Sequence, residues 1–278
     1  MNSADRSHQT LLPSRWLAIR QPVPFGWRVA LGAIPGIVLL AVWMLLTAGE
    51  AEERVISVTI LPSPIEVVGE IRSLWFEREL SRCAMASLLR VVGGFVVALI
   101  VAFPLGLLMG SFSRVRALFQ PSMVFSSYLP IPALVPLTMS LFGIDETQKI
   151  MFLALAFVIF LLPLFVRAID DVDDVYLRTA QTLGATRWQI VRRVLLGVSM
   201  AQIYDAMRLG FGVGWTYIIL AEMVAADRGL GEIIIVSQRR GPREHIYLVL
   251  LVIVLIAFLT DKCWAWVGKR LFPYREKA

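Results

Sequence analysis

The sequence predicts an all-α polytopic membrane protein with six transmembrane helices, and two observations carry this prediction. Of the 278 residues, 58% are hydrophobic and 17% are charged, whereas soluble domains are about 45–50% apolar and about 25% charged. The charges are also clustered. They leave uncharged windows after Arg28, after Arg90 and after Arg116 that each hold about 20 residues or more, enough to cross the hydrocarbon core.

The apolar windows place the spans along the chain. In chain order, we expect them at residues 29–48, 87–109, 118–142, 150–167, 203–225 and 246–267. The first lies between Arg28 and Glu50, and the second stops before Arg114. The fourth begins after Lys149 and ends at Arg167. Acidic residues follow the first span where a signal peptidase would need small ones, so this span is not expected to be a cleavable signal.

The third span contains Pro130, Pro132 and Pro136. A proline removes a backbone donor and kinks or breaks a helix. Irregular backbone at membrane depth is tolerated only where protein or a water-filled cavity surrounds it. The segment is therefore either a kinked helix packed inside the protein or part of the lining of a pathway.

The fifth and sixth spans contain charged residues. In the fifth, Asp205 and Arg208 are three residues apart, so they can pair with each other on one helix face near the membrane surface. In the sixth, Asp261 and Lys262 are expected at the membrane interface.

Basic residues are distributed unevenly between the loops, and cytoplasmic loops carry an excess of Lys and Arg. Basic residues outnumber acids in the N-terminal tail, in the loop between the second and third spans, and in the C-terminal tail. Glutamates are abundant between the first and second spans. The distribution predicts that both termini are cytoplasmic, and that the loop between the fourth and fifth spans lies on the same side.

Three pairs of glycines that are four residues apart lie within spans. They are Gly32 and Gly36, Gly106 and Gly110, and Gly210 and Gly214. Glycines at this spacing line one helix face and let two backbones approach closely.

Motifs of several other functions are missing from the sequence. Gly268-Lys269 is followed by Arg270 and lacks the first glycine of a phosphate-binding loop, so no nucleotide motor is expected in this chain. We find no Ser–His–carboxylate set and no metal-ligand spacing, and Cys83 and Cys263 are far apart. The net charge of +6 fits cytoplasmic loops better than nucleic-acid binding. We therefore expect no catalytic residue, metal, cofactor or nucleic-acid partner for this chain.

A polar, basic and helix-prone segment separates the fourth and fifth spans. Its pattern is Thr179-Ala180, then Gly184-Ala185, then Val194-x-Leu196. This pattern resembles the cytoplasmic EAA loop of ABC importer permeases, in which a coupling helix docks into the ATPase subunit. The charge distribution puts the segment in the cytoplasm independently of the motif.

Further motifs occur in the same order as in ABC importer permeases of the nitrate/sulfonate/taurine branch. With them, the resemblance covers residues 61–274. These motifs lie at residues 61–68, 87–95, 130–137, 142–150, 207–210, 221–224 and 229–231. The resemblance implies a type I ABC importer permease fold with a cytoplasmic tail at 1–28, a transmembrane domain at 29–268 and a cytoplasmic tail at 269–278. The coupling loop would occupy residues 170–197.

The resemblance also implies roles for individual residues. The coupling residues would be Thr179, Ala180, Leu183, Gly184, Ala185 and Trp188. Two short helices flanking Gly184 would present Leu183, Ala185 and Trp188 to a groove on the ATPase. Trp188 has a simpler interpretation as an interfacial anchor, and Gly184 as a helix cap. The translocation path would include Pro130, Pro132, Pro136 and Arg208.

The implied partners are ABC ATPase subunits that bind ATP and Mg²⁺, a periplasmic or lipid-anchored substrate-binding protein, a second permease chain, identical or related, and the lipids of the bacterial inner membrane. The implied substrate is a small anion such as nitrate, a sulfonate or taurine, or a related small organic solute. Arg208 could contact such an anion.

Two residues depart from the family pattern. Arg178 stands where the family has an acid, and Gly197 stands where it has a proline that ends the loop. Glycine is also a helix breaker, so we expect an interruption at Gly197. Two alternatives stay open: a secondary transporter that works without ATP, and a membrane scaffold that transports nothing.

Overall fold

The computed structural model describes residues 23–49, 54, 56–57, 60–224 and 226–274, and these residues form helices and loops without a β-strand. Residues 1–22 of the expected N-terminal tail and 275–278 of the expected C-terminal tail lie outside the described residues, as does Ala225 at the end of the expected fifth span. The chain divides into two units, Met1–Pro64 and Ile65–Ala278.

The first unit contains one long helix, α1 (Phe25–Leu46), which corresponds to the span expected at 29–48. None of its residues is buried, and apolar residues cover every side, as suits a helix that faces lipid. The helix ends at Thr47, whose hydroxyl donates to the Trp43 carbonyl at 2.8 Å. Among the described residues of this unit, no atom lies within 4 Å of a Cβ built at Gly32 or Gly36.

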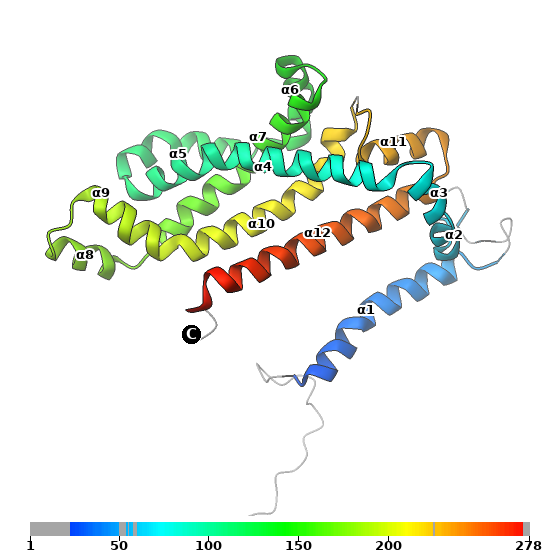
Figure 1. Ribbon diagram of the computed structural model, residues 1–278, viewed down its shortest axis with the longest axis horizontal. Helices are drawn as coiled ribbons and strands as arrows, with labels where there is room; N and C mark the ends of the chain where they lie inside the picture. Colours follow the sequence, from blue (N-terminus) through cyan, green and yellow to red (C-terminus); the bar gives the residue numbers. More distant parts are fainter. Residues whose placement is uncertain (1–22, 50–53, 55, 58–59, 225, 275–278) are drawn as a thin grey trace, which may run out of the picture. The chain divides into compact units, whose positions relative to one another are not determined.

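The second unit is a bundle with several short helices at its two ends (Figure 1). Its long helices are α4 (Leu80–Ser111), α7 (Glu146–Asp170), α10 (Leu196–Glu222) and α12 (Glu244–Leu271). Its shorter helices are α2 (Pro64–Gly69), α3 (Ile71–Phe76), α5 (Ser113–Ser127), α6 (Leu134–Phe142), α8 (Asp174–Thr182), α9 (Arg187–Gln189) and α11 (Leu230–Arg240). A 3₁₀ turn covers Ile131–Ala133, and a π-helix covers Ile190–Leu195.

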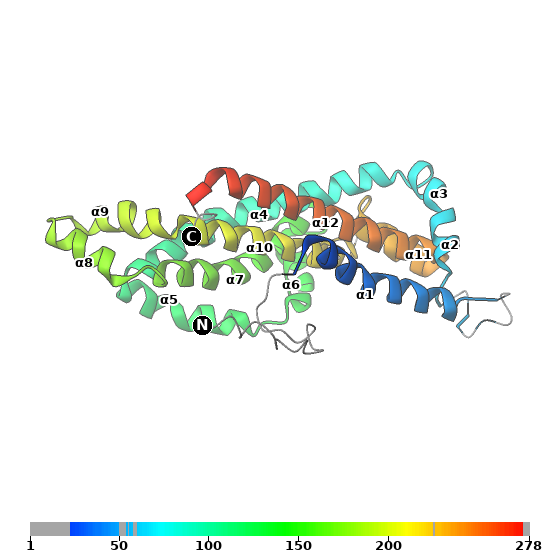
Figure 2. The same cartoon turned by 90° about the horizontal axis from the view of Figure 1, so that it is seen from below.

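Helix α7 is the centre of this bundle, with α4 along one side and α10 along another, while α12 packs against α10 (Figure 2). The centre is apolar and tightly filled: Phe152, Phe157, Phe165 and Leu161 of α7 are at most 1% exposed. Burying such side chains against neighbouring helices fixes the bundle, because close packing maximises dispersion contacts.

Two of the three predicted glycine pairs make the close contacts expected of them. A Cβ at Gly106 would lie 2.7 Å from the Phe165 Cβ, and one at Gly110 would lie 2.7 Å from the Ile169 Cβ. Gly210 and Gly214 of α10 face other side chains of α7 with as little space. Glycine thus lets α4 and α10 approach α7 closely, and at Gly106 and Gly110 an added Cβ would meet the Cβ atom of its neighbour.

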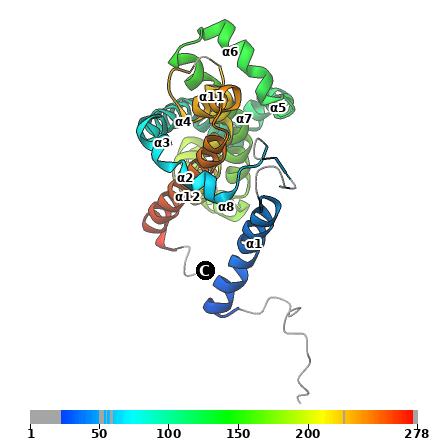
Figure 3. The ribbon, with the colours of Figure 1, turned by 90° about the vertical axis from the view of Figure 1, so that its right-hand side faces the viewer.

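Four of the predicted spans correspond to helices that are long and apolar enough to cross a membrane, namely α1, α4, α7 and α12. The predicted third span is not one helix. It consists of α5 and the segment Ile131–Phe142, which includes α6, and the two parts meet at 93° (Figure 3). The interpretation of a single kinked helix is therefore wrong, because Pro130 and Pro132 stop α5 instead of bending it. The predicted fifth span corresponds to α10, which is long but contains Asp205 and Arg208 and is not one of these four helices.

Candidate functional site

Helices α8 and α9 form a polar hairpin at one end of the bundle, and its first helix has a defined beginning and end (Figure 1). The Asp173 carboxylate caps the start by accepting a hydrogen bond from the Val175 N–H at 2.9 Å. At the other end, the Gly184 N–H donates to Gln181 O at 2.9 Å and the Ala185 N–H donates to Ala180 O at 3.0 Å. This bonding is a Schellman cap, which needs a left-handed residue, and Gly184 has φ +76°. The predicted turn at Gly184 is confirmed.

The second helix of the hairpin begins with a capping box at Thr186. The Thr186 N–H donates to Gln189 Oε1 at 2.8 Å, and the Gln189 N–H donates to Thr186 Oγ1 at 3.4 Å. From there α9 runs through the π-helix directly into α10. The expected interruption at Gly197 is wrong, because the helix continues through this residue with its backbone bonds intact. The second helix of the hairpin is therefore continuous with α10 through the π-helix.

The hairpin exposes apolar side chains that a solvated loop would not be expected to carry. Leu183 is 82% exposed and Trp188 is 59% exposed. Thr179 and Gly184 are also exposed, whereas Ala180 and Ala185 are half-buried. Val175 and Tyr176 of α8 are also exposed, and neither was predicted from the sequence as part of this surface. Exposed apolar residues of this kind mark a surface for another protein or for lipid.

Arg178 projects from α8 beside Asp174, with 3.8 Å between Arg178 Nη2 and Asp174 Oδ2. The two side chains are 81% and 77% exposed, and such surface pairs contribute little to stability. The positive charge that replaces the family's acid is therefore available at the surface of the hairpin.

The proline segment between α5 and α6 is open on one side. Pro130, Pro132 and Pro136 are exposed, whereas Ile131 and Leu134 between them are buried. A groove of about 520 Å³ lies along α5 and is lined by Ala117, Gln120, Pro121, Val124, Phe125 and Tyr128. The structure thus places the three prolines on an exposed surface, next to a largely apolar groove.

Arg208 of α10 lies apart from the prolines and is held by α12. Its Nε and Nη2 donate to Asp261 Oδ1 and Oδ2 at 2.6 and 2.7 Å, a bidentate ion pair. The carboxylate that binds the Arg208 guanidinium in this bidentate way is thus Asp261, and Asp205, the partner that the sequence suggested, interacts with it electrostatically. The side chain reaches across to the neighbouring helix, where a carboxylate matches both of its donors.

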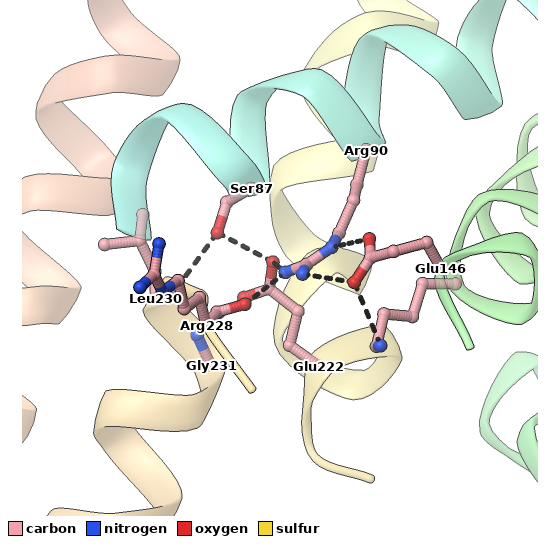
Figure 4. Close-up of polar contacts among 8 residues, drawn as sticks. Ser87, Arg90, Glu146, Glu222, Arg228, Leu230 and Gly231 are labelled. Atoms are coloured by element: carbon pink, nitrogen blue, oxygen red, sulfur yellow. Dashed lines mark hydrogen bonds and ion pairs between the residues drawn. The ribbon is translucent and has the colours of Figure 1, made fainter. Parts of the chain in front are cut away.

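A second polar cluster joins α4, α7, α10 and the turn before α11, at the end of the bundle away from the hairpin (Figure 4). At its centre, the Arg90 side chain of α4 is 6% exposed. Its Nε and Nη2 donate to Glu146 Oε2 and Oε1 at 2.6 and 2.7 Å. Its Nη1 donates to Glu222 Oε1 and to the Arg228 carbonyl, both at 2.6 Å.

Glu222 completes this cluster from the last turn of α10. It accepts from Ser87 Oγ at 2.7 Å and from the Gly231 N–H at 2.8 Å. Ser87 Oγ in turn accepts from the Leu230 N–H at 3.0 Å. The Glu222 side chain is fully buried in protein.

Glycines let the turn before α11 come close to Glu222. Gly229 has φ +152°, and a Cβ there would overlap the Glu222 carboxylate. A Cβ at Gly231 would lie 2.8 Å from the Glu222 Cβ. The Gly229-Leu-Gly motif is therefore needed for the buried cluster. The motif is recognisable in the sequence, but nothing local to it indicates this contact.

The chain is similar in sequence to several known membrane transport proteins. Residues 94–272 match the family described as "Binding-protein-dependent transport system inner membrane component". The taurine transport system permease protein TauC of Escherichia coli K12 is 30% identical over 277 residues, which cover 97% of this chain and 96% of that protein. The nitrate import permease protein NrtB of Synechocystis is 26% identical over 260 residues, covering 88% and 90%.

A solved structure has the same fold. The chain aligns with a structure of the MetNI methionine ABC transporter in an inward-facing conformation, with a TM-score of 0.64 and 18% sequence identity. The alignment covers 72% of this chain and 98% of that chain. At this level of identity, the likeness shows the fold alone.

Proposed function

The chain belongs to the family of binding-protein-dependent transport system inner membrane components, and from that membership we propose how this ABC importer permease works. The chain is a translocation subunit without a catalytic role. ATP and Mg²⁺ bind to a separate ATPase, and the α8–α9 hairpin is the docking element. The single observation that carries this proposal is the capped hairpin with Leu183 and Trp188 exposed.

The hairpin suits docking for a physical reason. The end of α8 and the start of α9 are both capped by hydrogen bonds within the hairpin, so its conformation does not depend on a partner. Leu183 and Trp188 offer apolar surface, and large side chains in the centre of an interface supply most of its binding energy. Thr179, Ala180, Gly184 and Ala185 shape the turn that presents them. Closure of two ATPases then moves the hairpins as rigid bodies.

We propose that the substrate is a small anion, such as a sulfonate, taurine or nitrate, or a related small organic solute. The names of two relatives support this class, since one is a taurine and the other a nitrate permease. Pro130, Pro132 and Pro136 lie on the exposed surface beside α5, which suits a path completed by a second permease chain. Arg208 contributes to the inner part of this path, with its charge balanced by Asp261.

We propose a topology of six spans, in which α10 and the bent α5–α6 segment count as spans beside α1, α4, α7 and α12. Both termini and the hairpin are cytoplasmic in the bacterial inner membrane. The opposite end, with α11 and the Arg90 cluster, then faces the periplasm, where a substrate-binding protein delivers its cargo. The charge distribution between the loops supports this orientation.

Uptake into liposomes tests the proposed function. The chain is co-purified with its ATPase and reconstituted, and the loaded binding protein is added with radiolabelled taurine, an alkanesulfonate or nitrate. We expect uptake of one of these anions that requires both ATP and the binding protein. Uptake driven by an ion gradient without ATP would instead identify a secondary transporter.

A further inference from the structure

The two helices that carry the hairpin are also connected at their other ends. Helix α7 ends at Asp170, shortly before α8, and α10 continues directly from α9. At the far end, α7 begins with Glu146 and α10 ends with Glu222 (Figure 4). Arg90 binds both of these carboxylates with one guanidinium group.

Between their ends, α7 and α10 are packed without space. Leu161 of α7 fills the position beside Gly210, and Phe157 fills the position beside Gly214. The helices are thus held by the hairpin at one end, by packing in the middle and by Arg90 at the other end. Two helices that are connected at both ends and packed in the middle cannot separate from each other at either end.

We infer that Arg90 is a positioning residue for transport. It holds α7, the hairpin and α10 together so that they move as one unit, and it connects this unit to the turn before α11. The inference rests on the proposed function of the chain. Arg90 also binds the Arg228 carbonyl in that turn, and Glu222 binds the Gly231 N–H just after it. A displacement of the turn by a loaded binding protein therefore moves the hairpin at the opposite end.

The chemistry of the site requires arginine. One planar guanidinium serves two carboxylates and a carbonyl at once, whereas the ammonium group of lysine is a compact point charge without that fork. The two carboxylates also differ, because Glu222 is fully buried and the Glu146 side chain is 58% exposed. The ion pair between Arg90 and Glu222 is therefore shielded from water, whereas water can reach the ion pair between Arg90 and Glu146.

The test uses the complete transporter in liposomes. ATP hydrolysis is measured with and without substrate-loaded binding protein, and the ratio of the two rates reports how well the two ends are coupled. Arg90→Lys and Glu222→Gln should lower this ratio about 5-fold or more, the usual size of a coupling between sites. Hydrolysis without binding protein and co-purification of the ATPase should stay as in the wild type. A merely structural role would not separate these readouts.

The matched control is Arg116→Lys, which alters another interhelical ion pair, between Arg116 of α5 and Asp170 of α7 at 2.7 Å. This variant should keep the wild-type ratio. If Arg90→Lys keeps it too, the inference is overturned. If Arg90→Lys does not assemble, Ser87→Ala replaces it, since it removes hydrogen bonds to Glu222 and Leu230 without changing a charge. A wild-type ratio in Ser87→Ala would overturn the inference as well.

Failure of the proposed function gives a different result. In that case the wild-type transporter itself shows no ATP-dependent uptake of the anions tested. If the wild type transports and the Arg90 and Ser87 variants are coupled normally, only the positioning role of Arg90 is refuted.

Discussion

Arg90 of α4 and Glu222 of α10 lie 132 residues apart in the chain and form a buried ion pair, with Arg90 Nη1 2.6 Å from Glu222 Oε1. Removing one partner leaves the other charge buried without compensation, which typically costs about 3–5 kcal/mol. We therefore expect Arg90→Ala or Glu222→Ala to lower the thermal unfolding midpoint of the purified protein strongly. Glu146→Gln, at the exposed end of the same cluster, should cost about 1 kcal/mol or less. Equal losses in all three variants would contradict this account of the cluster.

Gly106 and Gly212 provide a matched test of helix packing. A Cβ at Gly106 would lie 2.7 Å from the Phe165 Cβ, whereas no atom lies within 4 Å of a Cβ at Gly212. Gly106→Ala should destabilise the protein by about 1–3 kcal/mol through overpacking. Gly212→Ala should be neutral or stabilise it by up to about 1 kcal/mol, because alanine favours the helix. Thermal unfolding of both variants in one detergent checks the difference, and a more stable Gly106→Ala would refute it.

Gly184 tests the cap of the hairpin. Nothing surrounds its Cβ position, so the effect of a substitution comes from the backbone, where φ is +76°. Gly184→Val should strain the turn by about 1–2 kcal/mol and weaken ATPase co-purification and uptake. Gly184→Asn should be milder, because asparagine tolerates the left-handed conformation. Both variants should insert into the membrane normally. Normal co-purification and uptake in the valine variant would make Gly184 an ordinary loop residue.

Cysteine labelling tests the proposed topology. A membrane-impermeant thiol reagent added to intact cells should label a cysteine at Arg240, an exposed residue at the end of α11. It should not label a cysteine at Thr186 in the hairpin until the cells are opened. The exposed native Cys263 should first be replaced by serine. Labelling of Thr186→Cys in intact cells would overturn the orientation and the docking role of the hairpin together.

The long helices could be predicted because lipid imposes a simple local rule. Long apolar windows with few charges identified α1, α4, α7 and α12. Proline and glycine were informative for the same reason. Pro130 and Pro132 marked the break between α5 and α6, and Gly184 marked the turn of the hairpin, because these residues restrict or free the backbone wherever they occur.

Partners across the bundle could not be predicted in this way. For Arg208, the sequence offered a neighbour three residues away, whereas the structure uses Asp261, 53 residues away. Arg90 and Glu222 both lie in motifs that the sequence analysis recognised, but nothing local indicates that they meet. The helices α2, α3 and α11 were also not predicted, because they are short and carry no long apolar window.

Co-purification of the ATPase with variants of the hairpin surface tests the central claim most directly. Leu183 and Trp188 are 82% and 59% exposed, so their replacement should not disturb folding. We predict that Leu183→Ser combined with Trp188→Ser abolishes co-purification and ATP-dependent uptake while the protein remains in the membrane. Gln181→Ala, an exposed change on the same hairpin, should preserve both. If the double variant retains its ATPase and transports normally, the hairpin is not the docking element.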